Sequence, residues 1–256
     1  MNFVIFRQGR TGSNLLVNLL QAHPQIQCEG EILGQQRLYL GRNRYLRALA
    51  RALSQRFPAH YLTWMASRRT RPIFGFKLLF AHARAPHKLL ADLHRREWLI
   101  IHLQRRHLFD LAISKSVALA TRHFGESSLP DYPGDIVIEI SMERFIELLQ
   151  GAITIRRREL DTLRHLPHFS VTYESDLLTE VDRNRIGNAV FAALHADLCH
   201  VATHWQRSWT RPYTEVVVNH AELREFMQTA RGAALQAEWD SLFPQTSASE
   251  NWAGEP

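Results

Sequence analysis

The sequence lacks the features that mark several large classes of protein. Its two cysteines, Cys28 and Cys199, cannot form a framework of several disulfide bridges, and no Cys and His residues stand at zinc-ligand spacing. We therefore expect a reducing compartment and no metal site. No apolar run reaches the roughly 18 residues that a membrane-spanning helix needs, and the start, MNFVIFRQGR, holds too short an apolar stretch for a secretory leader. We expect a cytoplasmic protein without a transmembrane segment.

Lysine is scarce, although the chain is basic. Only three of the 31 basic residues are lysines, the rest are arginines, and the formal net charge is +6. The arginine guanidinium grips phosphate and related oxyanions with two parallel hydrogen bonds, so this composition favours an anionic ligand. A biased genome and a solvated surface would give the same composition, and composition alone leaves both explanations open.

Nothing divides the chain before its end: it has no internal repeat and no linker rich in Pro, Gly or Ser. We expect one domain over residues 1–245 and a frayed tail over residues 246–256. Short apolar runs alternate with segments of helical spacing, which predicts an α/β fold whose central, mostly parallel sheet is flanked by helices. Strands are expected at 2–6, 72–79, 98–103 and 168–173, and helices at 14–22, 37–57 (one or two), 86–95, 108–121, 142–166, 183–194 and 222–234.

The first strand runs into a glycine-containing loop, RQGRTGSNLL at residues 7–16, which opens a helix. Such a turn directs backbone N–H groups and the positive end of the helix dipole at one point, which suits an anion. The nucleoside triphosphatase version ends in GK[ST], and that lysine is missing here, with Arg10 inside the loop instead. The plainer alternative is an ordinary turn capped by Ser13.

A second pair of polar residues follows the third expected strand. Arg106 comes just after this strand and Ser114 eight residues later, two turns into the next helix. In a doubly wound sheet, ligands bind at the carboxyl ends of the strands, so both groups could converge on one phosphate. Taken alone, the pair would be a surface charge and an ordinary helical serine.

Together the two segments resemble the sulfotransferases that use 3'-phosphoadenosine-5'-phosphosulfate. SVTYESDLL at 170–178 and VVVNHAELREFM at 216–227 also resemble later elements of that family, in the same order. The resemblance implies a P-loop type of three-layer fold, in which the first loop binds the 5'-phosphosulfate and the Arg and Ser pair binds the 3'-phosphate. The donor-binding residues are then Arg7, Arg10, Thr11, Gly12, Ser13, Asn14, Arg106 and Ser114.

Departures from the family pattern bear on the substrate. The branch that acts on phenols and steroids carries a loop lysine, a catalytic His two residues after a lysine and a late Arg-Lys-Gly segment, none of which occurs here. The RTGSNLL loop and the following CEGEIL resemble the branch that acts on carbohydrates, glycolipids and lipopolysaccharide. His107 stands where Asn or Asp often follows the 3'-phosphate arginine, which puts the contact made there in question.

The segment CEGEIL at residues 28–33 holds two glutamates, Glu29 and Glu31. The resemblance implies that a Glu in this segment takes the proton of the acceptor hydroxyl, and Glu31 matches better than Glu29. A sugar hydroxyl is a poor nucleophile until a base within hydrogen-bond reach removes its proton. Lys77, near the end of the second expected strand, could steady the leaving phosphate or be an edge lysine with an exposed head.

We therefore predict transfer of a sulfuryl group from the phosphosulfate donor to a hydroxyl of a sugar or glycolipid, without a metal. Two rival functions stay open: a P-loop small-molecule kinase, which would require magnesium, and an arginine-rich nucleic-acid-binding domain, whose binding would weaken steeply with salt. We expect residues 37–71 to shape the acceptor pocket, and homo-oligomerisation is possible.

Overall fold

The structure is a computed structural model that describes residues 1–34, 54, 56–121, 136–201 and 211–243. Within these residues five strands form one parallel sheet in the order β2-β3-β1-β4-β5, as the sequence predicts. The strands are β1 (Asn2–Arg7), β2 (Ile26–Glu29), β3 (Ile73–Leu79), β4 (Trp98–Gln104) and β5 (Phe169–Thr172). The helices are α1 (Ser13–Gln21), α3 (Pro58–Ser67), η1 (Phe80–His82), α4 (Pro86–Arg95), α5 (Leu108–Thr121), α6 (Met142–Leu163), α7 (Tyr173–Asp176), α8 (Glu180–Ala193), α9 (Tyr213–Val216), α10 (His220–Gln228) and α11 (Ala230–Asp240).

Strand β1 lies at the centre of the sheet because both of its faces are apolar. Val4 pairs in register with Phe76 of β3 on one side and with Ile100 of β4 on the other. Its side chains from Phe3 to Phe6 are fully buried. Such an uninterrupted apolar run is typical of a parallel strand covered on both faces.

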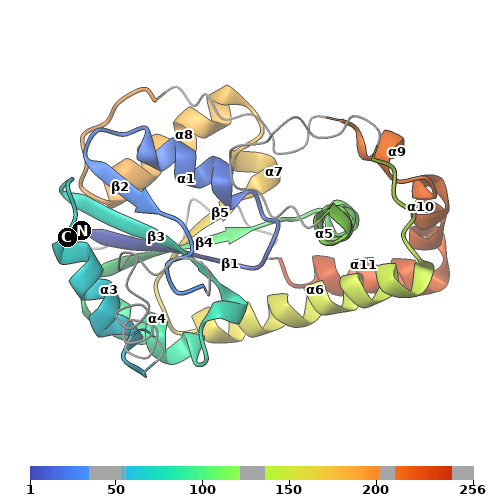
Figure 1. Ribbon diagram of the computed structural model, residues 1–256, viewed down its shortest axis with the longest axis horizontal. Coiled ribbons are helices and arrows are strands. Elements are labelled where there is room, and N and C mark those ends of the chain that lie inside the picture. The colour runs from blue at the N-terminus through green and yellow to red at the C-terminus, as the bar shows by residue number, and fades with distance from the viewer. Residues whose placement is uncertain (35–53, 55, 122–135, 202–210, 244–256) are drawn as a thin grey trace.

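Helices cover both faces of the sheet (Figure 1). On one face α1 and α8 pack on alternate strand residues such as Ile5 and Ile101, and on the other α3 and α4 pack on Val4 and Ile100. The fold is therefore the three-layer α/β arrangement that the sequence predicts. A further apolar cluster joins α5, α6 and α9–α11, and Figure 1 shows these helices beside the sheet.

Two elements differ from the sequence-based expectation. Residues 26–29 form the edge strand β2, although the segment from Cys28 onwards was expected to follow the first helix as a loop. The expected helix at 222–234 is two helices that turn at Thr229, whose hydroxyl accepts the N–H of Gly232 at 3.2 Å. A β-carbon on Gly232 would lie 2.2 Å from the carbonyl oxygen of Phe226, so glycine permits this tight turn.

The described part of the chain has no helix long and apolar enough to cross a membrane. Most of the expected helical segment 37–57 and the whole tail 246–256 lie outside the described residues. Of the segment expected to shape the acceptor pocket, the described portion includes α3, which packs beside α4.

Candidate active site

The loop between β1 and α1 turns on two residues with left-handed backbone. Arg10 has a φ of 69° and Gly12 a φ of 85°. A β-carbon on Gly12 would lie 2.2 Å from the ring of Tyr173, so only glycine lets the loop pass this close to the ring. The carbonyl of Gly12 accepts the N–H groups of Leu15 and Leu16 and so starts α1. The loop therefore has a fixed path into the N-terminus of the helix.

Ser13 does not cap α1, so the predicted Ser13 cap is wrong. Ser13 is the first helical residue, and the N-cap position belongs to Gly12, which has no side chain to bond the first-turn amides. Thr11 is buried, and its hydroxyl donates to the carbonyl of Gln8 at 3.2 Å, which closes the loop. A helix N-terminus without a side-chain cap directs amides and the positive dipole end at an anion.

The loop meets a segment 104 residues further along the chain. Nε of Arg10 donates a hydrogen bond to Oγ of Ser114 on α5 at 3.0 Å, and Ser114 is buried. The resemblance predicts that Arg10 binds the phosphosulfate and that Ser114 binds the 3'-phosphate of one donor. The structure brings them into direct contact.

Arg106 lies two residues after the end of β4 and is exposed, and hydrogen bonds hold its backbone N–H and its carbonyl. Its N–H donates to Oε2 of Glu174 at 2.7 Å, and its carbonyl accepts from Nε1 of Trp239 at 2.6 Å. Its guanidinium lies 5.9 Å from the centre of the Phe243 ring, and among the described residues no carboxylate is within ion-pair distance of it. Arg106 does not contact Ser114, so the two would be joined only through a ligand.

Arg105 is a neighbour of the loop that the sequence analysis did not select. Its Nη1 donates to the carbonyl of Arg10 at 3.1 Å, and its Nε lies 3.5 Å from Oε1 of Glu174. Its guanidinium also stacks over the ring of Tyr173, with 5.1 Å between its carbon and the ring centre. Arg105 thus holds the left-handed backbone of Arg10 in place, a role that no local sequence pattern indicates.

Glu31 is held by a buried cation. Nη2 of Arg7 donates to Oε1 of Glu31, while Nη1 of Arg7 donates to the carbonyl of Gln8 at 3.0 Å. Nδ1 of His82 lies 3.6 Å from Oε2 of Glu31 on the other side of the carboxylate, and burial lowers the pKa of His82 below its ordinary value. Arg7, which was expected to bind the donor, therefore supports Glu31 in this structure.

Glu29, the alternative base, lies at the end of β2. Its Oε1 accepts a hydrogen bond from Nε2 of Gln27 at 2.8 Å. Lys77 is buried in β3, and its Nζ donates to Oδ1 of Asn14 on α1 at 2.6 Å. The interpretation of Lys77 as an edge lysine with an exposed head is therefore wrong. Lys77 instead joins a residue of the loop to the strand beside Glu31.

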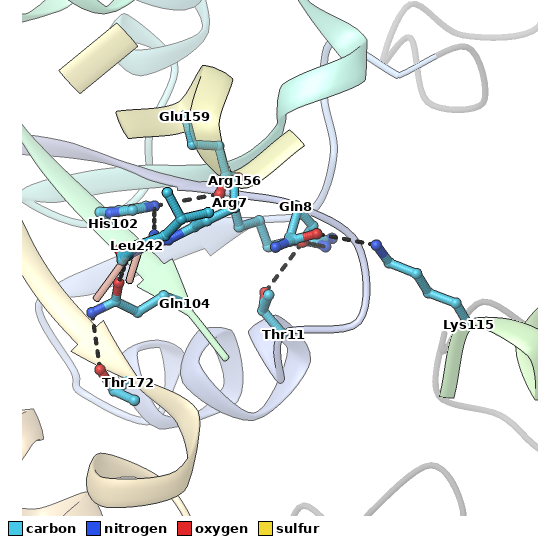
Figure 2. Close-up of polar contacts among 10 residues, drawn as sticks. All are labelled: Arg7, Gln8, Thr11, His102, Gln104, Lys115, Arg156, Glu159, Thr172 and Leu242. Atoms are coloured by element: carbon cyan, nitrogen blue, oxygen red, sulfur yellow. Dashed lines mark hydrogen bonds and ion pairs between the residues drawn. The ribbon is translucent and has the colours of Figure 1, made fainter. Parts of the chain in front are cut away.

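A buried polar network lies beneath the loop and was not expected from the sequence (Figure 2). Arg156 on α6 contacts Nε2 of His102 at 3.1 Å and donates to Oε1 of Gln104, the last residue of β4. Glu159, one turn further along α6, lies 3.6 Å from His102. Burial raises the pKa of Glu159 to about 8 against the opposing charges of Arg156, Lys115 and Arg7. This network fixes the end of β4, directly before Arg105 and Arg106.

Lys115, beside Ser114, also reaches the loop. Its Nζ donates to Oε1 of Gln8 at 3.0 Å, and burial lowers its pKa to about 8. The sequence could have indicated Lys115 as a candidate site residue, because it is the sole charged residue in the run 111–120, which is otherwise made of apolar and small residues. An isolated lysine in such a run is more than a solvated surface charge.

Among the described residues, no group of three or more His, Cys, Asp or Glu side chains is arranged to hold a metal ion. Both cysteines are free. The site therefore consists of a loop suited to an anion, with the cations Arg106 and Lys115 on one side of it. On the other side lies Glu31, which Arg7 holds in place. This arrangement can bind an anionic donor and present a base to a second substrate.

Comparisons with known proteins identify the fold. A solved structure that superposes on this chain is a sulfotransferase from Alicyclobacillus acidocaldarius, with a TM-score of 0.53, 16% sequence identity and 94% of each chain covered. The chain has the fold of a sulfotransferase. No protein-family model and no curated protein sequence matches it.

Two further solved structures are sulfotransferase domains, from the Synechococcus PCC 7002 olefin synthase and from the curacin biosynthetic pathway. Both have a TM-score of 0.47, with 16% and 12% identity respectively. The first comparison covers 97% of this chain and 90% of the other, and the second covers 98% and 94%.

Proposed function

We propose that the protein is a sulfotransferase that moves a sulfuryl group from 3'-phosphoadenosine-5'-phosphosulfate to a hydroxyl group. The contact between Arg10 and Ser114 carries this proposal. It joins the loop suited to a phosphosulfate with the helix suited to a 3'-phosphate, and a donor that bears both groups would span them. The fold of the chain is compatible with this activity.

In the proposed reaction the acceptor oxygen attacks sulfur, and the bond between sulfur and the 5'-phosphate oxygen breaks. The products are a sulfate ester and 3',5'-adenosine diphosphate. Arg10, Thr11, Gly12, Ser13 and Asn14 hold the phosphosulfate, and Arg106 and Ser114 select the 3'-phosphate. As in phosphoryl transfer, most of the rate enhancement would come from positioning and from charge stabilisation.

Glu31 is the proposed general base. Its carboxylate is anchored at Oε1 by Arg7, which leaves the side chain in one orientation. Glu29 is the alternative, and its Oε1 accepts a hydrogen bond from Gln27 within β2. Lys77 donates a hydrogen bond to Oδ1 of the donor-binding residue Asn14 and is proposed to stabilise negative charge on the leaving phosphate.

The proposed acceptor is a sugar or glycolipid, and the proposed compartment is the cytoplasm. Both rest on the resemblance of the RTGSNLL and CEGEIL segments and on the cysteine content. The direct test is incubation with a donor labelled in its sulfate and a mixture of bacterial glycolipids and simple sugars. We expect label in a sugar-containing product. Release of 3',5'-adenosine diphosphate with label in another hydroxyl compound would reject the acceptor class alone, and no transfer to any hydroxyl compound would reject the activity.

A further inference from the structure

Two successive residues of α5 contact the two halves of the loop. Ser114 accepts from Arg10, and Lys115 donates from Nζ to Oε1 of Gln8 at 3.0 Å. Figure 2 shows the side chain of Lys115 extending from α5 to Gln8, with Thr11 on the other side of Gln8. Gln8 is itself buried, and its carbonyl accepts from Thr11. Lys115 therefore reaches the place where the loop leaves β1.

The ammonium of Lys115 is poorly compensated where it lies. Its hydrogen-bond partner among the described residues is a neutral amide, although an ammonium has three N–H donors. No carboxylate of the described residues is within ion-pair distance of it, and Glu159 of α6 acts on it from further away. A partly buried cation without a paired anion costs free energy. An anion bound at the loop would remove that cost.

We propose that Lys115 is a donor-binding residue, whose ammonium bonds an oxygen of the 5'-phosphosulfate held by the loop. This inference rests on the proposed function. Lys115 would supply from α5 the lysine charge that the loop, which lacks the GK[ST] ending, does not contain. Two of its N–H groups have no partner among the described residues and can bond the ligand, while the third keeps its contact with Gln8.

The charge of Lys115 should make donor binding depend on pH. Burial lowers its pKa to about 8, and the carboxyl group of Glu159 on α6 acts in the opposite direction. Above this pH the free protein holds more of the neutral amine. Binding of an anion should then weaken as pH rises through about 8, because the amine must first take up a proton.

The first test is titration calorimetry with 3',5'-adenosine diphosphate at about pH 7 and about pH 9 on four proteins: wild type, Lys115→Met, Lys115→Arg and Lys88→Met. Lys88 on α4 is exposed and serves as the matched control. At the lower pH we expect Lys115→Met to bind about 10- to 150-fold more weakly, the range for a charged hydrogen bond. Lys115→Arg should bind at both pH values, because its guanidinium stays charged.

The second test needs no substitution, because the chain has only three lysines. Limited acylation followed by peptide mass spectrometry should modify Lys115, and 3',5'-adenosine diphosphate should protect it while Lys88 is modified equally in both samples. This readout holds even where Lys115→Met fails to fold.

The possible outcomes separate the inference from the function beneath it. The inference is overturned if the wild type binds the nucleotide and a folded Lys115→Met variant binds it with the same affinity. It is also overturned if the nucleotide does not protect Lys115 from acylation. Either result leaves the proposed function standing. If the wild type does not bind the nucleotide at either pH, the proposed function fails and the inference fails with it.

Discussion

The two sides of the loop carry charge in different ways. On the donor side, formed by β4 and α5, the cations Arg106 and Lys115 have no carboxylate of a described residue within ion-pair distance. On the proposed acceptor side, the cation Arg7 at the end of β1 is paired with Glu31, which follows β2. One side thus presents positive charge and the other presents a positioned carboxylate. This difference suits a reaction between an anionic donor and a neutral hydroxyl.

The comparison also explains why both sides need one loop. Gly12 brings the loop against Tyr173 and opens α1, Arg10 bonds Ser114 of the donor side, and Asn14 bonds Lys77 of β3, the strand beside Glu31. A change in the loop should therefore affect both sides. A change on either side should affect only its own substrate, and the following predictions use this separation.

Glu31→Gln should produce the largest effect. It keeps the size of the side chain and removes its ability to take a proton, so turnover should fall by about 10² to 10⁴. Affinity for 3',5'-adenosine diphosphate should stay the same, because Glu31 lies on the acceptor side. Steady-state kinetics measure the loss of turnover, and calorimetry measures the nucleotide affinity. A larger loss in Glu29→Gln than in Glu31→Gln would move the base to Glu29.

Gly12→Ala should disturb both sides together. The new β-carbon would lie 2.2 Å from the Tyr173 ring on a backbone with a φ of 85°, and we expect a loss of about 1–3 kcal/mol of unfolding free energy. Nucleotide binding should weaken as well. Gly9→Ala is the control in the same loop, since its β-carbon would meet its nearest neighbour only at 4.0 Å. Equal stability of the two variants, measured in urea, would show that the loop tolerates the change.

Arg106→Ala should affect the donor side alone. Its affinity for 3',5'-adenosine diphosphate should fall about 10- to 150-fold, the range for a hydrogen bond to a charged group. The fold should persist, because Glu174 and Trp239 bond the backbone of Arg106 and not its side chain. Affinity for adenosine 5'-diphosphate should not change. The control is Arg95→Ala on α4, which should bind both nucleotides like the wild type. The same result for Arg106→Ala would show that Arg106 is only a surface charge.

Glu159→Gln should change how stability depends on pH. Burial raises the pKa of Glu159 to about 8 in the folded protein, from 4.5 for an unperturbed carboxyl group. Between these values the folded state holds a proton that the unfolded state has released, so the contribution of Glu159 to stability falls as pH rises from about 5 to about 8. The variant lacks this loss. Urea unfolding of both proteins across that range should show the free energy of unfolding of the variant increasing relative to that of the wild type as pH rises. The same pH dependence in both proteins would contradict the raised pKa of Glu159.

The sequence predicted what depends on local pattern. The buried run of β1, the glycine loop after it and the positions of Arg10 and Ser114 could all be read from short segments. Strand β2 was missed because it is an edge strand of four residues, although its alternation of buried and half-buried residues is a strand pattern. Such a short segment carries little signal of its own.

The rest of the site depends on contacts that only the folded chain creates. Arg156 meets Gln104 across 52 residues, and Glu31 meets Arg7 across 24. The assignment of Arg7 to donor binding followed its place in the loop motif, whereas its partner comes from the segment after β2. Arg105 and Arg106 are adjacent and chemically identical, and only the fold shows that one holds the loop while the other stays exposed.

The central claim is that the donor side recognises a 3'-phosphate without a metal. Calorimetry with 3',5'-adenosine diphosphate and with adenosine 5'-diphosphate, each with and without a chelator, tests it most directly. We predict binding of the first nucleotide that survives the chelator, weak binding of the second, and a gain of about 2.7 kcal/mol in stability at a hundredfold the dissociation constant. Equal binding of the two nucleotides, or binding that the chelator abolishes, would contradict the account and favour a kinase.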